Sequence, residues 1–486
     1  MKIMEIDEEL KIFDTNLIRK FIKSSNNEID YWDIRAGLNI GTSIEFTNQK
    51  SKEVSFYENV ECSIRTFVNG GWGFYVLKDL NRSSLIEGFL KAIKLAKLSG
   101  SLTKTNFTIM KGDPLIKDFK AKSKKRVETI DIEEKINLVK THEKIASNYS
   151  DKVKNTRTVY LDGVNNSLFI NSNGSYISQN LELLRLFSVV YAQEEGIIQK
   201  GSNSTGGIGG FEITETEKAQ NLSVKSATEA VNLLKAKSPI GGKFDIIMDP
   251  KLTGTFIHEA FGHACEADLV LSKESILEGK IGEKVATDQI TIIDNPSFGQ
   301  GKNYNLPYEL YGSYFIDDEG IPAKKTVIIE GGIFKNYLHN LETASRMEVE
   351  PNGHGRAESS NSKPQVRMGF TYLEPRDWDL EEMIRDTKEG ILCEDFQYGY
   401  TDPTTGNFQF KCKISYKIEN GEKTQMMRDV SLSGLTLEVL NRITAIGDKK
   451  SFNYSDGLCG KGGQNLRVCD GGPYIRIKNI NVGGLN

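Results

Sequence analysis

Residues 31–80 alternate between polar and apolar positions, with interruptions at glycine and asparagine, as in CSIRTFVNGGWGFYV. A period of two places successive side chains on opposite faces of a strand, and Gly and Asn are typical of turns. This part of the chain therefore predicts antiparallel strands joined by turns.

Three later segments, 84–98, 132–146 and 224–235, predict helices. Ser84 and Glu87 form a candidate capping box at the start of the first helix, and Gly100 follows its end. Between the helices, Asn173-Gly174 predicts a hairpin turn, and the alternation in LLRLFSVVYAQ predicts a strand.

Two stretches of unusual composition predict irregular structure. The Gly-rich segment GSNSTGGIGG (201–210) predicts a loop. The basic segment KDFKAKSKKR (117–126) is interpreted as a solvated linker in preference to a nucleic-acid-binding segment.

The segment SPIGG (238–242) has the composition of a joint between domains. It is followed by a buried strand, KFDIIM, by a helix starting near residue 250, and then by strands and turns with few helices. We expect an α+β fold: an N-terminal mixed α/β region over 1–238, followed by a mainly antiparallel β domain over 239–486 that carries the helix near residue 250. Within the first region, a further boundary would fall near 105–128.

The length of 486 residues exceeds one typical hydrophobic core, which agrees with two or three domains, and 45 Gly against 11 Pro suits strands and turns. The net charge of -4 gives no basic excess that would indicate nucleic-acid binding. The acidic segment MKIMEIDEELKIFD lacks a signal-peptide core, and no apolar run is long enough to span a bilayer. We therefore expect a cytoplasmic protein without nucleic-acid or membrane partners, and its six scattered cysteines do not form a disulfide framework.

The helix near residue 250 separates apolar and chemically active side chains. Asp249 and Pro250 suit its N-cap and first position. At about 100° per residue, one half of the helix is apolar, whereas the other half carries the following residues: His258, Glu259, Gly262, His263 and Glu266.

His258 and His263 are five residues apart, one more than the usual zinc-binding pair. In a regular helix they would point about 140° apart, so a shared metal requires a widened turn, such as a π-bulge. Gly262 would ease the distortion because it lacks a side chain. The alternative is two unrelated histidines on a polar face.

A catalytic zinc site normally has three protein ligands and one open position. Cys459 is a candidate third ligand because its segment, DGLCGKGGQNL, predicts a Gly-rich loop that can approach a metal closely. Cys265 on the apolar face, Cys469 and Glu266 are weaker candidates. His142, His339 and His354 fit surface or hydrogen-bonded roles better.

The stretch HEAFGHACEAD resembles the HExxxH signature of the TldD/PmbA metallopeptidases. Further segments resemble the same family in the same order: FVNGGWGFYV, DDEGIPAKKTVIIEGGIFKNYL, TDPTTGNFQF with YKIENGE, and LCGKGGQ. The resemblance covers nearly the whole chain. Two arginine-containing segments, NGHGRAESS and KPQVRMGFTYLEP, match only loosely, and Gly369 stands where the family pattern suggests a polar residue.

The resemblance implies one zinc ion per chain, held by His258, His263 and Cys459, with Glu259 as the general base. It also implies an α/β N-terminal part, a largely β C-terminal part, and a dimer of identical or related subunits. Family members cleave small or unfolded peptides and process peptide precursors, and some are inactive partners of an active subunit.

The sequence thus predicts a zinc peptidase in which Glu259 takes a proton from the attacking water and passes it to the leaving amine. Glu266 is a candidate for supporting the site from behind the ligands. Two alternatives stay open: a non-catalytic peptide-binding partner subunit, and a zinc enzyme that acts on something other than peptides.

Overall fold

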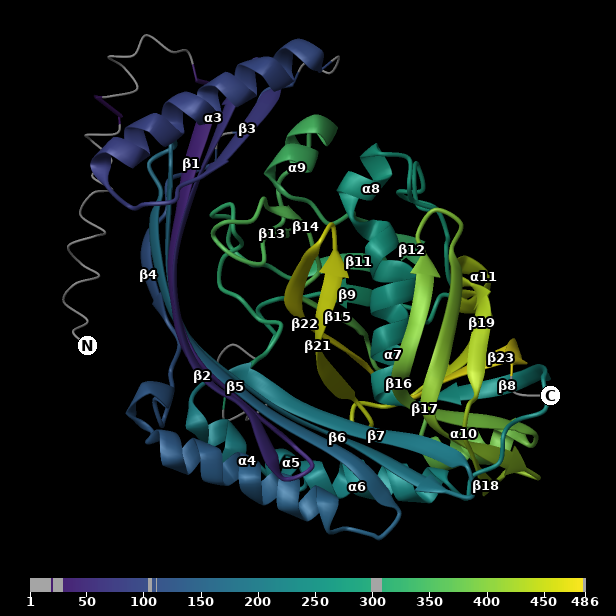
Figure 1. The fold of residues 1–486 in the computed structure, drawn as a ribbon. Helices are drawn as coiled ribbons and strands as arrows, with labels where there is room; N and C mark the ends of the chain where they lie inside the picture. Colours follow the sequence, from purple (N-terminus) through teal and green to yellow (C-terminus); the bar gives the residue numbers. More distant parts are fainter. Residues whose placement is uncertain (1–18, 21–28, 104–106, 111, 299–307, 484–486) are drawn as a thin grey trace.

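The computed structural model describes residues 19–20, 29–103, 107–110, 112–298 and 308–483; the acidic N-terminal segment lies outside these ranges. Their fold is α+β (Figure 1). The largest sheet has eight strands in the order β10-β7-β6-β5-β1-β2-β3, with β4 paired to β6. Its strands are β1 (Tyr31–Thr47), β2 (Lys50–Val68), β3 (Gly71–Val76), β4 (Ile116–Lys120), β5 (Val153–Asn171), β6 (Tyr176–Glu194), β7 (Ile197–Ile208) and β10 (Glu309–Leu310).

This long sheet curves around the rest of the molecule, as Figure 1 shows. Helices lie against its outer face: α3 (Arg82–Leu102) at one end, and α4 (Ile132–Ser147), α5 (Glu217–Gln220) and α6 (Leu222–Leu233) at the other. The inner face is thereby left toward the C-terminal half of the chain.

The C-terminal half contains two larger sheets, of seven and six strands, and a two-stranded one. The seven-stranded sheet contains β8 (Gly242–Met248), β16 (Gly390–Asp402), β17 (Asn407–Glu419), β18 (Glu422–Met427), β19 (Ser431–Leu435), β20 (Ile443–Ile446) and β23 (Ile475–Gly483). The six-stranded sheet contains β9 (Ile292–Asp294), β11 (Thr326–Glu330), β12 (Ile333–Phe334), β15 (Phe370–Leu373), β21 (Asn453–Lys461) and β22 (Gln464–Gly472), and β13 (Gly355–Arg356) pairs with β14 (Gln365–Val366).

Few helices accompany these strands, as expected: α7 (Pro250–Phe256), α8 (Ala267–Leu271), α9 (Leu341–Met347), α10 (Leu380–Thr387) and α11 (Thr436–Leu440). Helix α7 begins as the sequence predicts, because Asp249 accepts a hydrogen bond from the backbone N–H of Leu252 and Pro250 takes the first position. None of the helices in the described ranges is long and apolar enough to cross a membrane.

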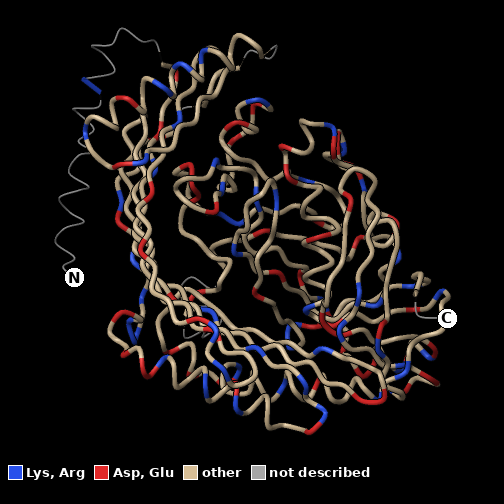
Figure 2. The backbone as a smooth tube through the Cα atoms, viewed as in Figure 1, with Lys and Arg blue, Asp and Glu red and all other residues tan. Residues whose placement is uncertain are grey.

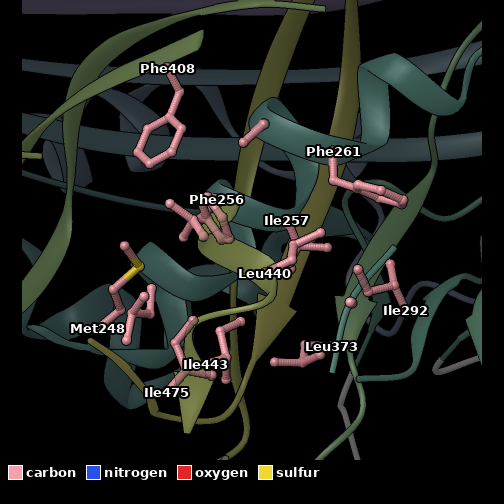
Figure 3. Packing of buried hydrophobic residues seen from close by; sticks show 14 of the residues in the cluster. Met248, Phe256, Ile257, Phe261, Ile292, Leu373, Phe408, Leu440, Ile443 and Ile475 are labelled. Atoms are coloured by element: carbon pink, nitrogen blue, oxygen red, sulfur yellow. The ribbon is translucent and has the colours of Figure 1, made fainter. Parts of the chain in front are cut away.

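The main hydrophobic core surrounds α7 and the turn that follows it (Figure 3). Phe256 is fully buried, and its ring lies 5.3 Å from that of Phe408 in β17. Ile257 and Phe261 continue the buried side of the segment. Each such side chain stabilises the fold by about 1.5–3 kcal/mol, so the apolar half of this segment fixes the orientation of its other half.

The structure corrects three local expectations. The first helix is capped by Asn81, whose side chain accepts a hydrogen bond from the Ser84 backbone, and it runs past Gly100 to Leu102. The basic segment interpreted as a linker contributes strand β4. The Gly-rich segment 201–210 is not a loop, because most of it belongs to β7.

The glycines of β7 have a packing role that composition does not reveal. A side chain at Gly201 would place its Cβ 2.0 Å from the carbonyl oxygen of Ser226 in α6. A side chain at Gly207 would meet the ring of Tyr308 at 2.3 Å. Close approach, and not turn formation, therefore accounts for these two glycines.

Candidate metal centre

The two histidines of the HExxxH segment lie at the ends of a π turn. The backbone forms a π-helix over Ile257–Gly262, and the N–H of His263 donates a hydrogen bond to the carbonyl oxygen of His258. This bond from residue i+5 to residue i confirms the predicted widening. The imidazole rings are 5.3 Å apart between centroids and nearly perpendicular.

Gly262 owes its place to packing and not to an unusual backbone conformation. Its φ of -58° and ψ of -45° are ordinary helical values. A Cβ at this position would lie 2.1 Å from the sulfur of Met368. The expectation that Gly262 serves by easing backbone distortion is therefore wrong in its physical reason.

Cys459 meets these histidines from the other end of the sequence. One ligand atom from each of His258, His263 and Cys459 lies within 4.8 Å of the others. The Cys459 sulfur is 3.2 Å from His263 Nε2. Cys459 is in strand β21, paired with Leu466, and the glycine turn comes only after it, so the predicted Gly-rich loop is a hairpin at this point.

The buried donors of this cluster fit a metal ion. His258 is only 1% exposed, and neither of its ring nitrogens has a hydrogen-bond partner among the described residues. Buried polar nitrogens are normally hydrogen-bonded, so this histidine lacks the partner that its burial requires. Two imidazoles and one thiol form a donor set that zinc accepts, with one position open.

The thiol is poised to be a thiolate. Burial raises the pKa of Cys459, but the neighbouring charges of His263 and His258 lower it further, to about 5. Burial lowers the pKa of His263, whereas Glu266 and Cys459 raise it well above its ordinary value. Metal binding requires a deprotonated thiol and neutral imidazoles, so binding would release protons from the histidines.

Glu266 holds His263 from behind. Its Oε2 lies 3.0 Å from His263 Nδ1 and accepts a hydrogen bond of 2.9 Å from Lys461 Nζ. Burial raises the pKa of Glu266, but Lys461 and His263 lower it to about 2. A carboxylate on the second ring nitrogen fixes the tautomer and orientation of a ligating histidine.

The backbone that places Glu266 behind His263 differs from the single helix that the sequence predicts. Glu266 does not share a continuous helix with Glu259, because the helix ends at Cys265 and Glu266 is extended. Lys461, two residues after Cys459, also donates hydrogen bonds of 2.8 Å to Asp268 and of 3.0 Å to the Val366 carbonyl. Sequence reasoning missed Lys461 as a residue with a role, although it stands in the quoted LCGKGGQ segment.

Glu259 faces a cleft of about 620 Å³ between the π turn and the long sheet. Its side chain is 34% exposed, and its Oε2 lies 3.8 Å from His263 Nε2. Asp470 lines the same cleft, and burial raises its pKa to about 7. The site therefore presents one open carboxylate beside the cluster, and a second carboxyl group that titrates near neutral pH.

The remaining candidate ligands lie in other contacts. Cys265 is fully buried and donates to the Phe261 carbonyl, and the Cys469 sulfur accepts a hydrogen bond from the Gly312 backbone. The other histidines all have hydrogen-bonded ring nitrogens: His142 with Ser223, His339 with Thr343, and His354 with Asp294 and Asn352.

One of the two arginine-containing segments, KPQVRMGFTYLEP, contacts the strand that carries Cys459. Arg367 is fully buried and donates hydrogen bonds to the backbone carbonyls of Cys459 and Gln464. Gly369 has no space for a polar side chain, because a Cβ would come within 2.9 Å of Pro296 and Tyr314. Its backbone N–H donates to Asp294 instead.

Sequence profiles of one protein family match most of the chain. Residues 32–98 match PmbA/TldA metallopeptidase domain 1, residues 125–237 match the central domain, and residues 241–484 match the C-terminal domain. Together these matches include all residues of the cluster.

Curated relatives carry metalloprotease names. A metalloprotease of Methanothermobacter thermautotrophicus is 39% identical over 97% of this chain and 99% of its own length. A zinc metalloprotease TldD homolog of Saccharolobus solfataricus is 27% identical over 96% of this chain and 99% of its own length.

Solved structures show the same fold at low identity. TldE from Thermococcus kodakarensis superposes with a TM-score of 0.73 at 17% identity, over 97% of this chain and 99% of that one. A Thermotoga maritima protein described as a candidate modulator of DNA gyrase superposes with a TM-score of 0.74 at 21% identity, over 97% of this chain and 100% of that one.

Proposed function

The chain belongs to the TldD/PmbA family of metallopeptidases, and we propose that it is a zinc-dependent peptidase acting on short or unfolded peptides. One observation carries the zinc assignment. The buried His258 has no hydrogen-bond partner in the described chain, and it lies within ligand distance of His263 and Cys459.

In this proposal His258, His263 and Cys459 hold the metal, and Glu266 keeps His263 in the orientation that leaves Nε2 toward the metal. Zinc, when bound, would supply a Lewis acid that polarises a peptide carbonyl and makes water easier to deprotonate near neutral pH. Lys461 balances the buried charge of Glu266.

Glu259 performs the proton transfers. Its partly exposed carboxylate accepts the proton of the attacking water and donates it to the amine that leaves. The long sheet forms the wall of the cleft opposite the cluster.

The site is recessed, since His258 is 1% exposed and Cys459 is 5% exposed. A peptide segment that is free of its own tertiary contacts can enter a cleft of this size, whereas a folded domain cannot. We therefore propose preference for short or unfolded chains over stable globular proteins.

The proposal also includes assembly as a dimer with an identical or a related subunit, as the family resemblance implies. Light scattering on the purified chain, alone and mixed with a related subunit from the same cell, would give the stoichiometry. A stable monomer under both conditions would remove this part of the proposal.

One experiment tests the peptidase assignment as a whole. The purified chain is analysed for zinc and offered one polypeptide in folded and in denatured form. We expect about one zinc per chain and rapid cleavage of the denatured form alone. Peptide binding without cleavage would instead support a non-catalytic partner subunit, and equal cleavage of both forms would contradict the recessed site.

A further inference from the structure

The long sheet supplies the wall of the cleft opposite the metal cluster. In β6 the wall residues alternate, with Arg185, Phe187 and Val189 on the cleft side. In β7, Lys200 and Ser202 belong to the same side, because Lys200 pairs with Tyr191 and Ser202 pairs with Val189. One regular face of the sheet therefore meets whatever occupies the cleft.

Five cationic side chains line the cleft, although the chain as a whole has a net charge of -4: Arg185, Lys200, Lys218, Lys251 and Lys413. Elsewhere, Lys and Arg are interspersed with Asp and Glu along the backbone (Figure 2). The lining also contains four carboxylates, Glu259, Asp395, Asp456 and Asp470, so what matters is which of the cations these carboxylates engage.

Three of these cations already form ion pairs with carboxylates of the protein. Lys218 lies 2.8 Å from an oxygen of Asp456. Lys251 and Lys413 lie 3.3 Å and 3.0 Å from the same oxygen of Asp395. Their charges are therefore engaged in ion pairs within the protein.

Arg185 and Lys200 are different. Within the described chain, neither has an ion pair or a side-chain hydrogen bond with a protein group, although the charge of Arg185 is close enough to Asp456 to help lower the pKa of that carboxyl group. The guanidinium of Arg185 lies 5.3 Å from the centroid of the Tyr311 ring, and its Nε is buried without a partner. Lys200 is half-buried, and burial and the nearby charge of Lys413 lower its pKa.

An unpaired cation at a half-buried position retains its attraction for an anion, because solvent screens it less than at an open surface. The planar guanidinium of Arg185 suits a carboxylate in particular. Peptides offer carboxylates in two forms, the side chains of Asp and Glu and the C-terminal group.

Resting on the proposed function, we propose that the cleft selects peptides that carry carboxylates, with Arg185 and Lys200 as two separate anchoring residues. Lys200 pairs with Tyr191, six residues along β6 from Arg185. At about 3.3 Å per residue, their backbone positions are about 20 Å apart along the sheet. One carboxylate cannot reach both, so each cation contributes its own contact.

Binding of matched peptides to the full chain tests this inference. The protein carries Glu259→Gln, so that a bound peptide is not consumed. The probes are labelled, unstructured peptides of about ten residues, which span about 33 Å when extended. One has two Glu six residues apart, its partner has Gln at both positions, and both have blocked ends.

We expect the Glu peptide to bind about 25-fold more tightly, since each half-buried ion pair contributes about 5-fold and distant pairs act independently. Lys200→Gln and Arg185→Gln should each reduce this ratio to about 5, and the double variant to about 1. Added salt should reduce the ratio as well.

Lys225→Gln is the matched control, because Lys225 is exposed on α6, the helix against the outer face of the same sheet. It removes one charge from the same domain and should leave the ratio at its parent value. Lys200→Glu should in addition favour a peptide with Lys at the corresponding position.

A third pair of peptides, without Glu and with a free or an amidated C-terminus, separates the two sources of carboxylate. Tighter binding of the free form that either variant abolishes would assign that anchor to the C-terminal group. Equal affinity for each matched pair of peptides, or preferences that survive in the double variant, would overturn the inference.

The experiment distinguishes a failure of the proposed peptidase function from a failure of the anchoring inference. A chain with Glu259 intact that binds Glu peptides preferentially but never hydrolyses them would remove the peptidase assignment and keep the anchors. Hydrolysis of Glu and Gln peptides with equal kcat/KM and equal affinity would keep the peptidase assignment and remove the two anchors.

Discussion

On the wall side of the cleft, β6 and β7 pair without a shift in register from Leu183 to Glu194. On the opposite side, Cys459 also belongs to a regular strand, but the segment from His258 to Glu266 changes its backbone conformation several times. His258 and His263 flank a π turn, and Glu266 is extended between two short helices. The first side presents every second side chain to the cleft, and the second brings three ligand atoms, from His258, His263 and Cys459, within 4.8 Å of one another.

The difference follows from what each side has to do. A row of contacts along an extended peptide needs only the period of two that a strand provides. Ligands for one metal must converge, and two side chains five residues apart do not converge on a regular helix of 3.6 residues per turn. Convergence of His258 and His263 therefore requires an irregular backbone, against which the surrounding core and Met368 pack.

The contrast between the two sides of the cleft depends most strongly on Cys459 being a metal ligand. Cys459→Ser should remove most of the zinc and, with it, peptide hydrolysis, because one of three protein ligands is lost. The loss in zinc affinity should exceed the roughly 100-fold that an outer partner costs. Elemental analysis and a chelator competition measure it, and Cys265→Ser, at a buried thiol outside the cluster, is the control.

Glu259→Gln should separate binding from chemistry. The variant should keep its zinc and lose about 10²–10⁴-fold in kcat/KM, since a positioned general base contributes about that much. Zinc content and peptide turnover are measured on the same sample. Hydrolysis at the parent rate would move the proton transfer to another group, for which Asp470 in the same cleft would be the next residue to test.

Glu266→Gln tests the contact that holds His263. We expect the zinc affinity to fall by about 10–100-fold, as for other outer partners of ligating histidines. The loss of charge also leaves Lys461 with a weaker partner. Glu274→Gln, an exposed carboxylate in the same segment, is the matched control and should bind zinc like the parent.

Gly262→Ala asks whether packing or flexibility explains the glycine in the π turn. The added methyl group would overlap the sulfur of Met368, and overpacking of this kind costs about 1–3 kcal/mol of stability. A double-mutant cycle with Met368→Ala should show strong coupling, with part of the stability recovered. Additive effects on the free energy of unfolding would mean that Met368 is not the cause.

The sequence predicts the two sides of the cleft to different degrees. The five-residue spacing of the histidines requires a widened turn, and the structure has one. The wall was only half predicted, because the glycines of β7 indicated a loop. Their actual reason is close contact with α6 and Tyr308, which depends on residues far away in sequence.

Residues that act through a long-range partner were the hardest to predict. Lys461 has no pattern of its own, and its three partners come from the region after the π turn and from Val366. Arg185 did carry a signal, since it is the only charged residue in the apolar part of LLRLFSVVYAQ. Its position across the cleft from His258 and Cys459 could be known only from the fold.

The last prediction needs no substitution, because the rate at which Cys459 is alkylated depends on its pKa and therefore on the two histidines beside it. Burial raises the pKa of Cys62 and of Cys469 to about 12, whereas the histidines hold that of Cys459 at about 5. In the zinc-free chain, Cys459 should therefore be a thiolate at neutral pH and the preferred target of an alkylating agent. Its labelling rate should be flat above pH 6 and fall about tenfold per pH unit below 5, since acid protonates the thiolate.

Zinc should suppress this labelling, because the same sulfur that reacts would be a ligand. Mass spectrometry of the modified peptide measures the rate with and without the metal, and iodoacetamide under denaturing conditions verifies that all six thiols are otherwise available. Labelling of Cys459 that rises only above pH 8, as for an ordinary thiol, would mean that the two histidines do not act on it. The convergence on the irregular side of the cleft would then be one of distance alone, without electrostatic coupling between the thiol and the two histidines.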